Sequence, residues 1–317
     1  MPLRVAVIGV GYLGRHHARI LSTLPGVELV AVVDTNGARG EQVASAHGTR
    51  AVTAYRDVIG QVDAVTIAVP TERHLEVALP FLSAGVSVLV EKPMARSLDE
   101  ADAMIGAAKK AGVALAVGQT ERFNPAVAVA RSMLTDPRFI EVHRLGTFPE
   151  RSLDIDVVFD LMIHDLDVVL SLVGSEVESI DAVGVPVLTG RVDIANARLR
   201  FENGCIANLT ASRISRDRVR KIRFFQPAAY LSIDYAAQKV ERWRLVKSEG
   251  GAPSIQGGDV DVTNEEPLKR ELEDFVEAVV DRRPPLVTGE DGRRALALAQ
   301  AITDRINEAT KTRKHET

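Results

Sequence analysis

A lysine directly after a short apolar strand is one candidate catalytic residue of this 317-residue chain. The stretch from Val86 to Met94 reads VSVLVEKPM, and its apolar run is typical of a parallel strand covered on both faces. Ligands of open α/β sheets bind outside the carboxyl ends of the strands, so Glu91 and Lys92 would lie where a substrate is handled. Taken alone, Lys92 could equally be a solvated lysine at a strand end.

A carboxylate and an imidazole four residues apart form a second candidate pair. Asp160 and His164 fall in a predicted helix over 156–173, in which the polar residues follow one narrow stripe. An Asp160 carboxylate that holds one ring nitrogen of His164 would fix the tautomer and leave the other nitrogen free to accept a proton. The alternative is a solvated polar stripe on an otherwise apolar helix.

Three glycines at the spacing G-x-G-x-x-G predict a dinucleotide site near the N-terminus. Gly9, Gly11 and Gly14 lie between a predicted strand and a predicted helix. In that order the first glycine permits a tight turn, the second lets backbone approach a pyrophosphate, and the third lets the helix pack on the strand. Tyr12 and Leu13 belong to the same loop, and we include them among the expected cofactor contacts.

An aspartate indicates which nicotinamide cofactor binds. Asp34 ends a predicted strand over 28–33, about 20 residues after the last glycine of the motif. Its carboxylate could accept both ribose hydroxyls of an adenosine, and it would repel a ribose 2′-phosphate. We therefore expect NAD as the cofactor, while Arg39 on the next helix leaves use of NADP open.

The elements around these residues predict a doubly wound parallel sheet over residues 1–118. Further strands alternate with helices at 64–69, 86–92 and 113–117. Thr71, His74 and Gln119 follow carboxyl ends of these strands, so we add them, together with Glu91 and Lys92, to the cofactor side. His74 could instead cap or pack the helix that begins there.

The rest of the chain predicts an α+β domain over 119–288 and a last helix over 289–317. From Val177 onward, short runs separated by turn signals indicate a mainly antiparallel sheet. One face of such a sheet would be free to pair with a second subunit, so we expect a homo-oligomer. The Gly-rich stretch 248–263 is expected to be an irregular excursion.

Several polar residues of this second region are candidates for substrate binding. Arg122 and Asn124 follow the last strand of the parallel sheet and would face a cleft between the domains, or would form a surface salt bridge and a helix cap. Arg213 is a further expected substrate contact. A basic cluster could meet phosphate or could be a solvated face, and it comprises Arg216, Arg218, Arg220, Lys221 and Arg223.

Composition excludes several classes of function. A net charge of -4 gives no general attraction to nucleic acid. The single cysteine, Cys205, permits no internal disulfide, and no apolar run approaches membrane-spanning length, so we expect a cytoplasmic protein without a membrane partner. His16 and His17 have no further Cys or His at ligand spacing, so we expect packing roles for them and no metal site.

The chain as a whole resembles a known family. Its glycine motif, the Glu91-Lys92-Pro93 stretch, the run DLMIHDLD at 160–167 and the closing GEDGRR are similar to the glucose-fructose oxidoreductase and inositol dehydrogenase (Gfo/Idh/MocA) family. The resemblance implies a Rossmann domain, a second domain whose open sheet forms dimers or tetramers, and a last helix that packs back on the first domain. It also implies that Lys92, Asp160 and His164 are catalytic.

A narrower resemblance concerns the substrate. The stretches RFNP, DIANARLRFENG, ANLTASR and SIDYAAQ are similar to the family members that oxidise UDP-N-acetylglucosamine in lipid A sugar modification. Gln119 stands where many members have His, and Met162 where many have Gly. We expect NAD-dependent oxidation of a secondary hydroxyl of a sugar nucleotide, with Lys92, Arg122, Asn124, Asp160, His164 and Arg213 on the substrate. A free sugar or inositol is the alternative substrate, and a dinucleotide-sensing regulator is the alternative function.

Overall fold

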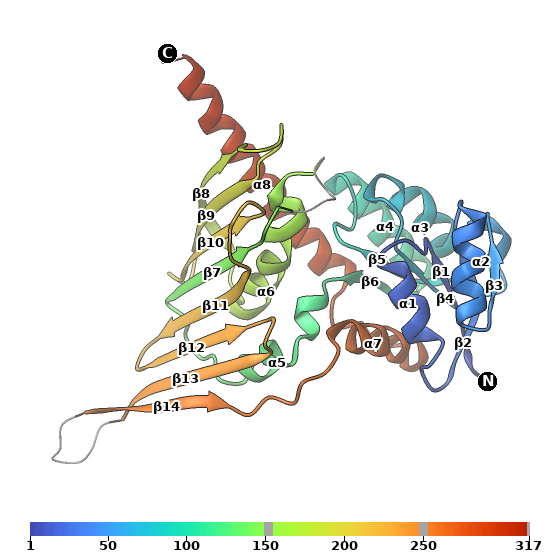
Figure 1. Ribbon diagram of the computed structural model, residues 1–317, viewed down its shortest axis with the longest axis horizontal. Helices are drawn as coiled ribbons and strands as arrows, with labels where there is room; N and C mark the ends of the chain where they lie inside the picture. The colour runs from blue at the N-terminus through green and yellow to red at the C-terminus, as the bar shows by residue number, and fades with distance from the viewer. Residues whose placement is uncertain (149–154, 247–252, 316–317) are drawn as a thin grey trace. The chain divides into compact units, whose positions relative to one another are not determined.

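The computed structural model describes residues 1–148, 155–246 and 253–315, with side chains as far as residue 309 (Figure 1). Its backbone forms two compact units. The first comprises Met1–Thr120 and Glu266–Leu296, and the second comprises Glu121–Glu265 and Ala297–Thr317.

A six-stranded parallel sheet forms the centre of the first unit, in the strand order β3-β2-β1-β4-β5-β6. The strands are β1 Leu3–Ile8, β2 Val27–Val33, β3 Arg50–Val52, β4 Ala64–Ile67, β5 Ser87–Glu91 and β6 Leu115–Gly118. The helices are α1 Gly14–Leu21, α2 Gly37–Ala46, α3 His74–Ser83, α4 Leu98–Ala111 and α7 Pro267–Asp281. The order reverses between β1 and β4, which is the doubly wound arrangement that the sequence predicted.

The strands of this sheet are apolar because both of its faces are covered. All five residues of β5 and all four of β6 are buried. Ile20 and Leu21 of α1 and Leu272 and Phe275 of α7 belong to one core with strand residues such as Val5. Since α7 buries its apolar side in this core, residues 266–288 group with the first unit, whereas we expected them in the second domain.

The long helix α8, Gly289–His315, runs through both units. Its first turn packs closely on β6: a Cβ added at Gly292 would lie 2.5 Å from Val117 Cγ2. Its later residues pack on the second unit, where Ile306 lies against Gly184.

An eight-stranded sheet forms the second unit, in the order β14-β13-β12-β11-β7-β10-β9-β8. Neighbouring strands are antiparallel except for the parallel pair of β7 and β10. The strands are β7 Phe139–Leu145, β8 Val177–Val185, β9 Ile194–Phe201, β10 Ile206–Ser212, β11 Val219–Gln226, β12 Ala229–Asp234, β13 Lys239–Val246 and β14 Ser254–Val260. The predicted fold class, a parallel Rossmann sheet plus a mainly antiparallel sheet, is confirmed.

Two local predictions for this unit were wrong in detail. Residues 254–260 form an edge strand, because their backbone pairs with β13 from Ser254 to Val260; the expected excursion otherwise includes 248–252, which lie outside the described residues. The helix predicted over 156–173 is a π-helical segment, Val158–Met162, followed by α6, Ile163–Val173. Such π-segments often occur at functional sites.

Short helices complete the second unit. Helix α5, Pro125–Arg131, contacts β12 and β13, and the π-helical segment contacts β10. Along β9 the buried residues alternate with exposed ones, so one face of the sheet is packed and the other is open. Within the described parts of the chain, each helix is too short or too polar to cross a bilayer.

Candidate functional site

The glycine loop of the first unit has the shape that a dinucleotide requires. A Cβ added at Gly14 would lie 1.8 Å from the carbonyl oxygen of Gly9, so only glycine lets α1 begin this close to the loop. At Gly11 nothing lies within 4 Å of such a Cβ, which leaves open space beside the backbone. The N–H groups at the start of α1 and this space fit a pyrophosphate.

Asp34 is held firmly at the end of β2. Its carboxylate accepts hydrogen bonds from the backbone N–H groups of Val10 at 3.0 Å and Asn36 at 2.8 Å. Arg39 binds the same carboxylate through Nε at 2.9 Å and Nη2 at 2.7 Å. Burial acts to raise the pKa of Asp34, but Arg39 and the two N–H groups hold that pKa below its usual value.

Lys92 follows β5 and is half-buried. The residues on both sides of it are anchored by buried histidines. Glu91 Oε1 lies 3.0 Å from His17 Nε2, and the backbone carbonyl of Pro93 lies 3.0 Å from His74 Nδ1. The other ring nitrogen of His74 lies 3.0 Å from the Val69 carbonyl, after β4. The ring of His74 therefore lies between two loops at the carboxyl edge of the sheet, where its neutral form can donate its one N–H to either side, and burial lowers its pKa.

The remaining cofactor candidates differ in exposure. Gln119 is 2% exposed, and within the described part of the chain its Oε1 has no hydrogen-bond partner. A buried acceptor left in this way suits a ligand donor. Tyr12 and Leu13 are exposed beside the glycine loop, and Thr71 begins a short turn of 3-10 helix, Thr71–Arg73. The residues present therefore fit a bound dinucleotide.

In the second unit, a buried ion pair fixes helix α6. Arg144 of β7 binds Asp165 twice, through Nε at 2.6 Å and Nη2 at 3.0 Å, and also binds Glu121 at 3.0 Å. Burial opposes the charge of Arg144, yet Asp165 and Glu121 raise its pKa. A bidentate pair of this kind orients α6 on the sheet.

Asp160 and His164 lie beside this anchor. Asp160 belongs to the π-helical segment, His164 is the second residue of α6, and both side chains are half-buried. His164 directly precedes the anchored Asp165 in the chain. Lys92 belongs to the first unit, whereas Asp160 and His164 belong to the second.

Arg122 and Asn124 take up the alternatives that the sequence had left open. Arg122 is 9% exposed, and its Nη1 lies 3.3 Å from Asp167 of α6. Asn124 caps α5 by accepting from the N–H of Ala126 at 3.1 Å, and it donates to the Tyr235 carbonyl at 3.0 Å. The salt bridge of Arg122 is buried, whereas the alternative interpretation was a surface salt bridge, and Asn124 forms the predicted cap; the substrate role of both residues stays a prediction.

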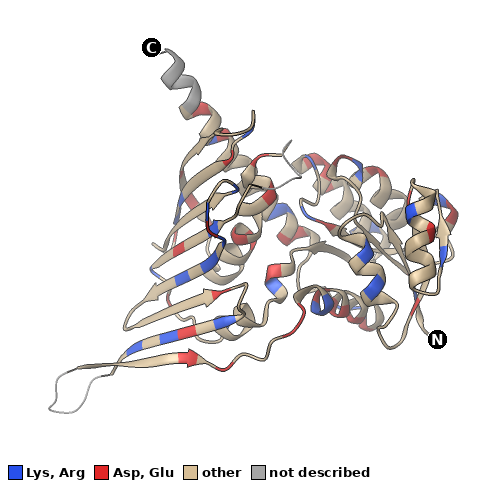
Figure 2. Ribbon diagram, viewed as in Figure 1, with Lys and Arg blue, Asp and Glu red and all other residues tan. Residues whose placement is uncertain are grey.

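The basic cluster is partly neutralised by neighbouring strands. Arg223 lies 2.8 Å from Glu141 of β7, and Lys221 lies 3.4 Å from Asp234 of β12. Lys, Arg, Asp and Glu are interspersed over these strands (Figure 2). Pairing of this kind indicates a solvated face for these two members of the cluster.

Arg213 is enclosed within its unit. It is 1% exposed, and its guanidinium binds Asp193 at 2.9 Å and the Ile155 carbonyl at 2.7 Å. Asp193 Oδ2 also accepts from three successive backbone N–H groups, those of Val187, Leu188 and Thr189. These contacts pack Arg213, which follows β10, against the turn between β8 and β9, and its role as a substrate contact stays a prediction.

Sequence reasoning missed Asp165, Arg144 and Asp193 as organising residues. The helix carrying Asp165 did contain a signal. Asp165 lies off the polar stripe, on an otherwise apolar side of the helix, and a buried carboxylate there requires a cation from another element.

Comparison with known proteins gives this site its context. The model described as "Oxidoreductase family, NAD-binding Rossmann fold" matches residues 3–119, and the "GFO/IDH/MocA C-terminal domain" matches 128–226. A UDP-N-acetylglucosamine 3-dehydrogenase of Acidithiobacillus ferrooxidans is 40% identical over 302 residues, 95% of this chain and 96% of the relative. The chain belongs to the GFO/IDH/MocA oxidoreductase family.

Other relatives agree with this family. A scyllo-inositol 2-dehydrogenase (NAD(+)) of Bacillus subtilis is 29% identical over 95% of this chain and 93% of its own length. A solved structure of the Acidithiobacillus UDP-N-acetylglucosamine 3-dehydrogenase has a TM-score of 0.91 at 38% identity and covers 96% of this chain and 98% of that one. A levoglucosan dehydrogenase solved with NADH and levoglucosan shares the fold, with a TM-score of 0.87 at 19% identity over 97% and 98% of the two chains. The first unit is therefore the NAD-binding part of this oxidoreductase.

The pairing of Asp34 with Arg39 predicts how this oxidoreductase selects its cofactor. Arg39 neutralises Asp34 and is itself 48% exposed, so it lowers the repulsion of a 2′-phosphate. Arg39→Leu should lower kcat/KM for NADP by about tenfold and leave NAD within about threefold. Steady-state kinetics with both cofactors measures the ratio, and Arg50→Leu, another exposed arginine of the same unit, is the control. An unchanged ratio would refute this role of Arg39.

Asp193 predicts a dependence of stability on pH. Burial acts to raise the pKa of Asp193, but the backbone N–H groups and Thr189 hold that pKa far below its usual value. Its stabilising contribution is thus complete above the unfolded pKa of about 3.9 and is lost as the pH falls further. Asp193→Asn should lower stability by about 3–5 kcal/mol at pH 7, because it leaves Arg213 buried without its carboxylate.

Denaturant unfolding at a series of pH values measures this effect. The difference between Asp193→Asn and the unsubstituted protein should shrink below about pH 4. The exposed Asp181→Asn on β8 is the matched control and should show little difference at any pH. A deficit for Asp193→Asn that stays constant with pH would contradict the assignment.

Proposed function

We propose that this oxidoreductase oxidises the 3-hydroxyl of UDP-N-acetylglucosamine, or of a closely similar sugar nucleotide, to a ketone with NAD. The observation that carries the proposal is the 40% identity to a UDP-N-acetylglucosamine 3-dehydrogenase along nearly the full length of both proteins. Three features support the cofactor part of the proposal. The glycine loop leaves open space for a pyrophosphate, the Asp34 carboxylate can accept from ribose hydroxyls, and the buried amide oxygen of Gln119 can accept from a ligand donor.

Oxidation of an alcohol removes a hydride and a proton. NAD, when bound, would accept the hydride. His164 would accept the hydroxyl proton and Asp160 would orient its ring, while the ammonium of Lys92 would hold the substrate oxygen as negative charge develops on it. All three residues are half-buried, so the protein can hold each side chain in place while a substrate can still reach it.

The packing of α6 supports this role for His164. Asp165 and Asp167 bind Arg144 and Arg122, and these two pairs hold the turn of α6 that directly follows His164. A general base must be held within hydrogen-bond reach of its proton, so a rigid helix serves it. Arg122 and Asn124 are proposed as residues of the substrate side, oriented by their bonds to Asp167 and Tyr235.

Assembly and location are further parts of the proposal. We infer a homodimer or homotetramer formed through the open face of the second unit's sheet. An aromatic row supports it: Phe139, Phe225, Tyr230 and Trp243 are paired in register across four strands, opposite the buried side chains. Light scattering would show two or four chains.

We also propose a cytoplasmic role in lipid A sugar modification.

A free sugar or inositol is the second candidate substrate, favoured by the similarity to inositol dehydrogenases. Binding of UDP separates the two candidates, because only an enzyme for sugar nucleotides should bind it. A ligand that binds the folded state raises the free energy of unfolding, by about 2.7 kcal/mol when the ligand is at a hundredfold excess over its Kd. The melting temperature rises as a result. A shift with UDP supports the sugar nucleotide, and a shift with myo-inositol alone supports the alternative.

The catalytic assignment predicts large and specific losses of activity. With UDP-N-acetylglucosamine and NAD, His164→Ala should lower kcat by about 10²–10⁴-fold, since it removes the proton acceptor. Lys92→Met should lower kcat by about 10²–10³-fold, since it removes the charge that stabilises the substrate oxygen. NADH absorbance measures turnover.

The matched control for Lys92→Met is Lys110→Met at the exposed end of α4, which should keep full activity. Both catalytic variants should still bind NAD, as fluorescence titration can show. Turnover that survives in either Lys92→Met or His164→Ala would defeat the assignment.

A further inference from the structure

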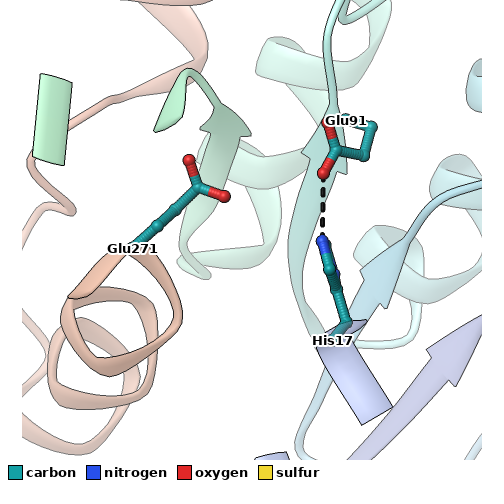
Figure 3. A group of neighbouring side chains, drawn as sticks. All are labelled: His17, Glu91 and Glu271. Carbon is teal, nitrogen blue, oxygen red and sulfur yellow. Dashed lines mark hydrogen bonds and ion pairs between the residues drawn. The ribbon is translucent and has the colours of Figure 1, made fainter. Parts of the chain in front are cut away.

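Three buried ionisable side chains meet inside the first unit, beside the strand that carries Lys92. They are His17 of α1, Glu91 at the end of β5 and Glu271 of α7, which are 0%, 6% and 1% exposed. One ring nitrogen of His17 and one carboxylate oxygen of each glutamate all lie within 4.8 Å of one another. Figure 3 shows Glu271 reaching from α7 toward the hydrogen-bonded pair of His17 and Glu91.

Two carboxylates this close in a buried place repel each other, and the one imidazole beside them can offset at most one negative charge. The desolvation of each and their mutual repulsion favour the binding of a proton by one of them. Glu91 Oε1 lies 3.0 Å from His17 Nε2, and Glu91 Oε2 accepts a hydrogen bond from the backbone N–H of Lys92 at 3.3 Å. Glu271 is the more deeply buried of the two, so a negative charge is more unfavourable on Glu271 than on Glu91.

The Glu91 carboxylate also contacts the backbone at Lys92. Its carboxylate lies against β6, where a Cβ added at Gly118 would be 3.0 Å from Oε2. Bonded to His17 on one side and to the Lys92 N–H on the other, this carboxylate fixes the peptide from which Lys92 extends. His74 fixes the next residues through the carbonyls of Pro93 and Met94.

We propose that His17, Glu91 and a protonated Glu271 are positioning residues for Lys92. Glu271 supplies a neutral acid that lets Glu91 stay ionised, and Glu91 holds the lysine's backbone in place. This inference rests on the proposed function only where it takes Lys92 to be the group that holds the substrate oxygen.

The variants Glu271→Gln and Glu91→Gln separate the two carboxylates. Glutamine has the shape of a protonated glutamate, so Glu271→Gln should keep kcat within about threefold. Glu91→Gln removes the charge and should lower kcat by about 10²-fold while KM for NAD stays within about threefold, because Lys92 and not the cofactor is displaced. His17→Gln retains an N–H donor and should keep more activity than His17→Leu.

A direct measurement of the proton does not depend on turnover. The infrared spectrum of the unsubstituted protein should contain a carboxylic-acid carbonyl band at neutral pH that disappears in Glu271→Gln and persists in Lys92→Met. Loss of this band in Glu91→Gln with its persistence in Glu271→Gln would overturn the assignment of the proton. A bound metal, found at one per chain by elemental analysis and lost in Glu271→Gln, would overturn it too.

The kinetic outcomes distinguish the two proposals. Full activity in Glu91→Gln together with an inactive Lys92→Met would refute the positioning role and leave the proposed function intact. Full activity in Lys92→Met would refute the proposed role of Lys92, and the infrared band would still decide where the proton lies.

Discussion

Burying a charged carboxylate costs several kcal/mol of free energy unless cations or N–H groups surround it. The contacts that offset this cost link the helices and strands that carry the candidate functional residues. In the first unit, Glu91 ties β5 to α1 through His17. In the second unit, Asp165 ties α6 to β7 through Arg144. Glu91 directly precedes Lys92 in the chain, and Asp165 directly follows His164. Lys92 and His164 therefore each extend from a backbone next to a carboxylate that is held by a buried hydrogen bond.

Buried carboxylates are also surrounded by N–H groups and cations at sites that contain no candidate catalytic residue. Asp193 gathers three backbone N–H groups and Arg213, and this cluster shapes a turn of the second sheet. A buried carboxylate is thus not in itself the mark of an active site. What distinguishes Glu91 and Asp165 is that their neighbours in the chain are half-buried residues of chemically useful types, whereas the neighbours of Asp193 are Val192 and Ile194.

Features that depend on neighbouring residues could be predicted from the sequence. The glycine motif with Asp34, the alternation of strands and helices, and the apolar run before Lys92 all follow from local patterns. The partners of buried charges could not be predicted from the sequence, because Arg144 lies on a strand and Asp165 on a helix that come together only in the folded protein. Gly257 and Gly258 suggested a loop, yet pairing with β13 makes them part of an edge strand, which tolerates their low strand propensity.

Transfer of a labelled hydride would test the central claim most directly. UDP-N-acetylglucosamine that carries deuterium at carbon 3 should deliver that deuterium to NAD in the presence of this protein, and mass spectrometry should find it in the NADH formed. The account also predicts that His164→Ala strongly slows this transfer under the same conditions. NADH formed without deuterium, or no transfer from this substrate while a free sugar or inositol labelled at its reacting carbon gives up its label, would contradict the account.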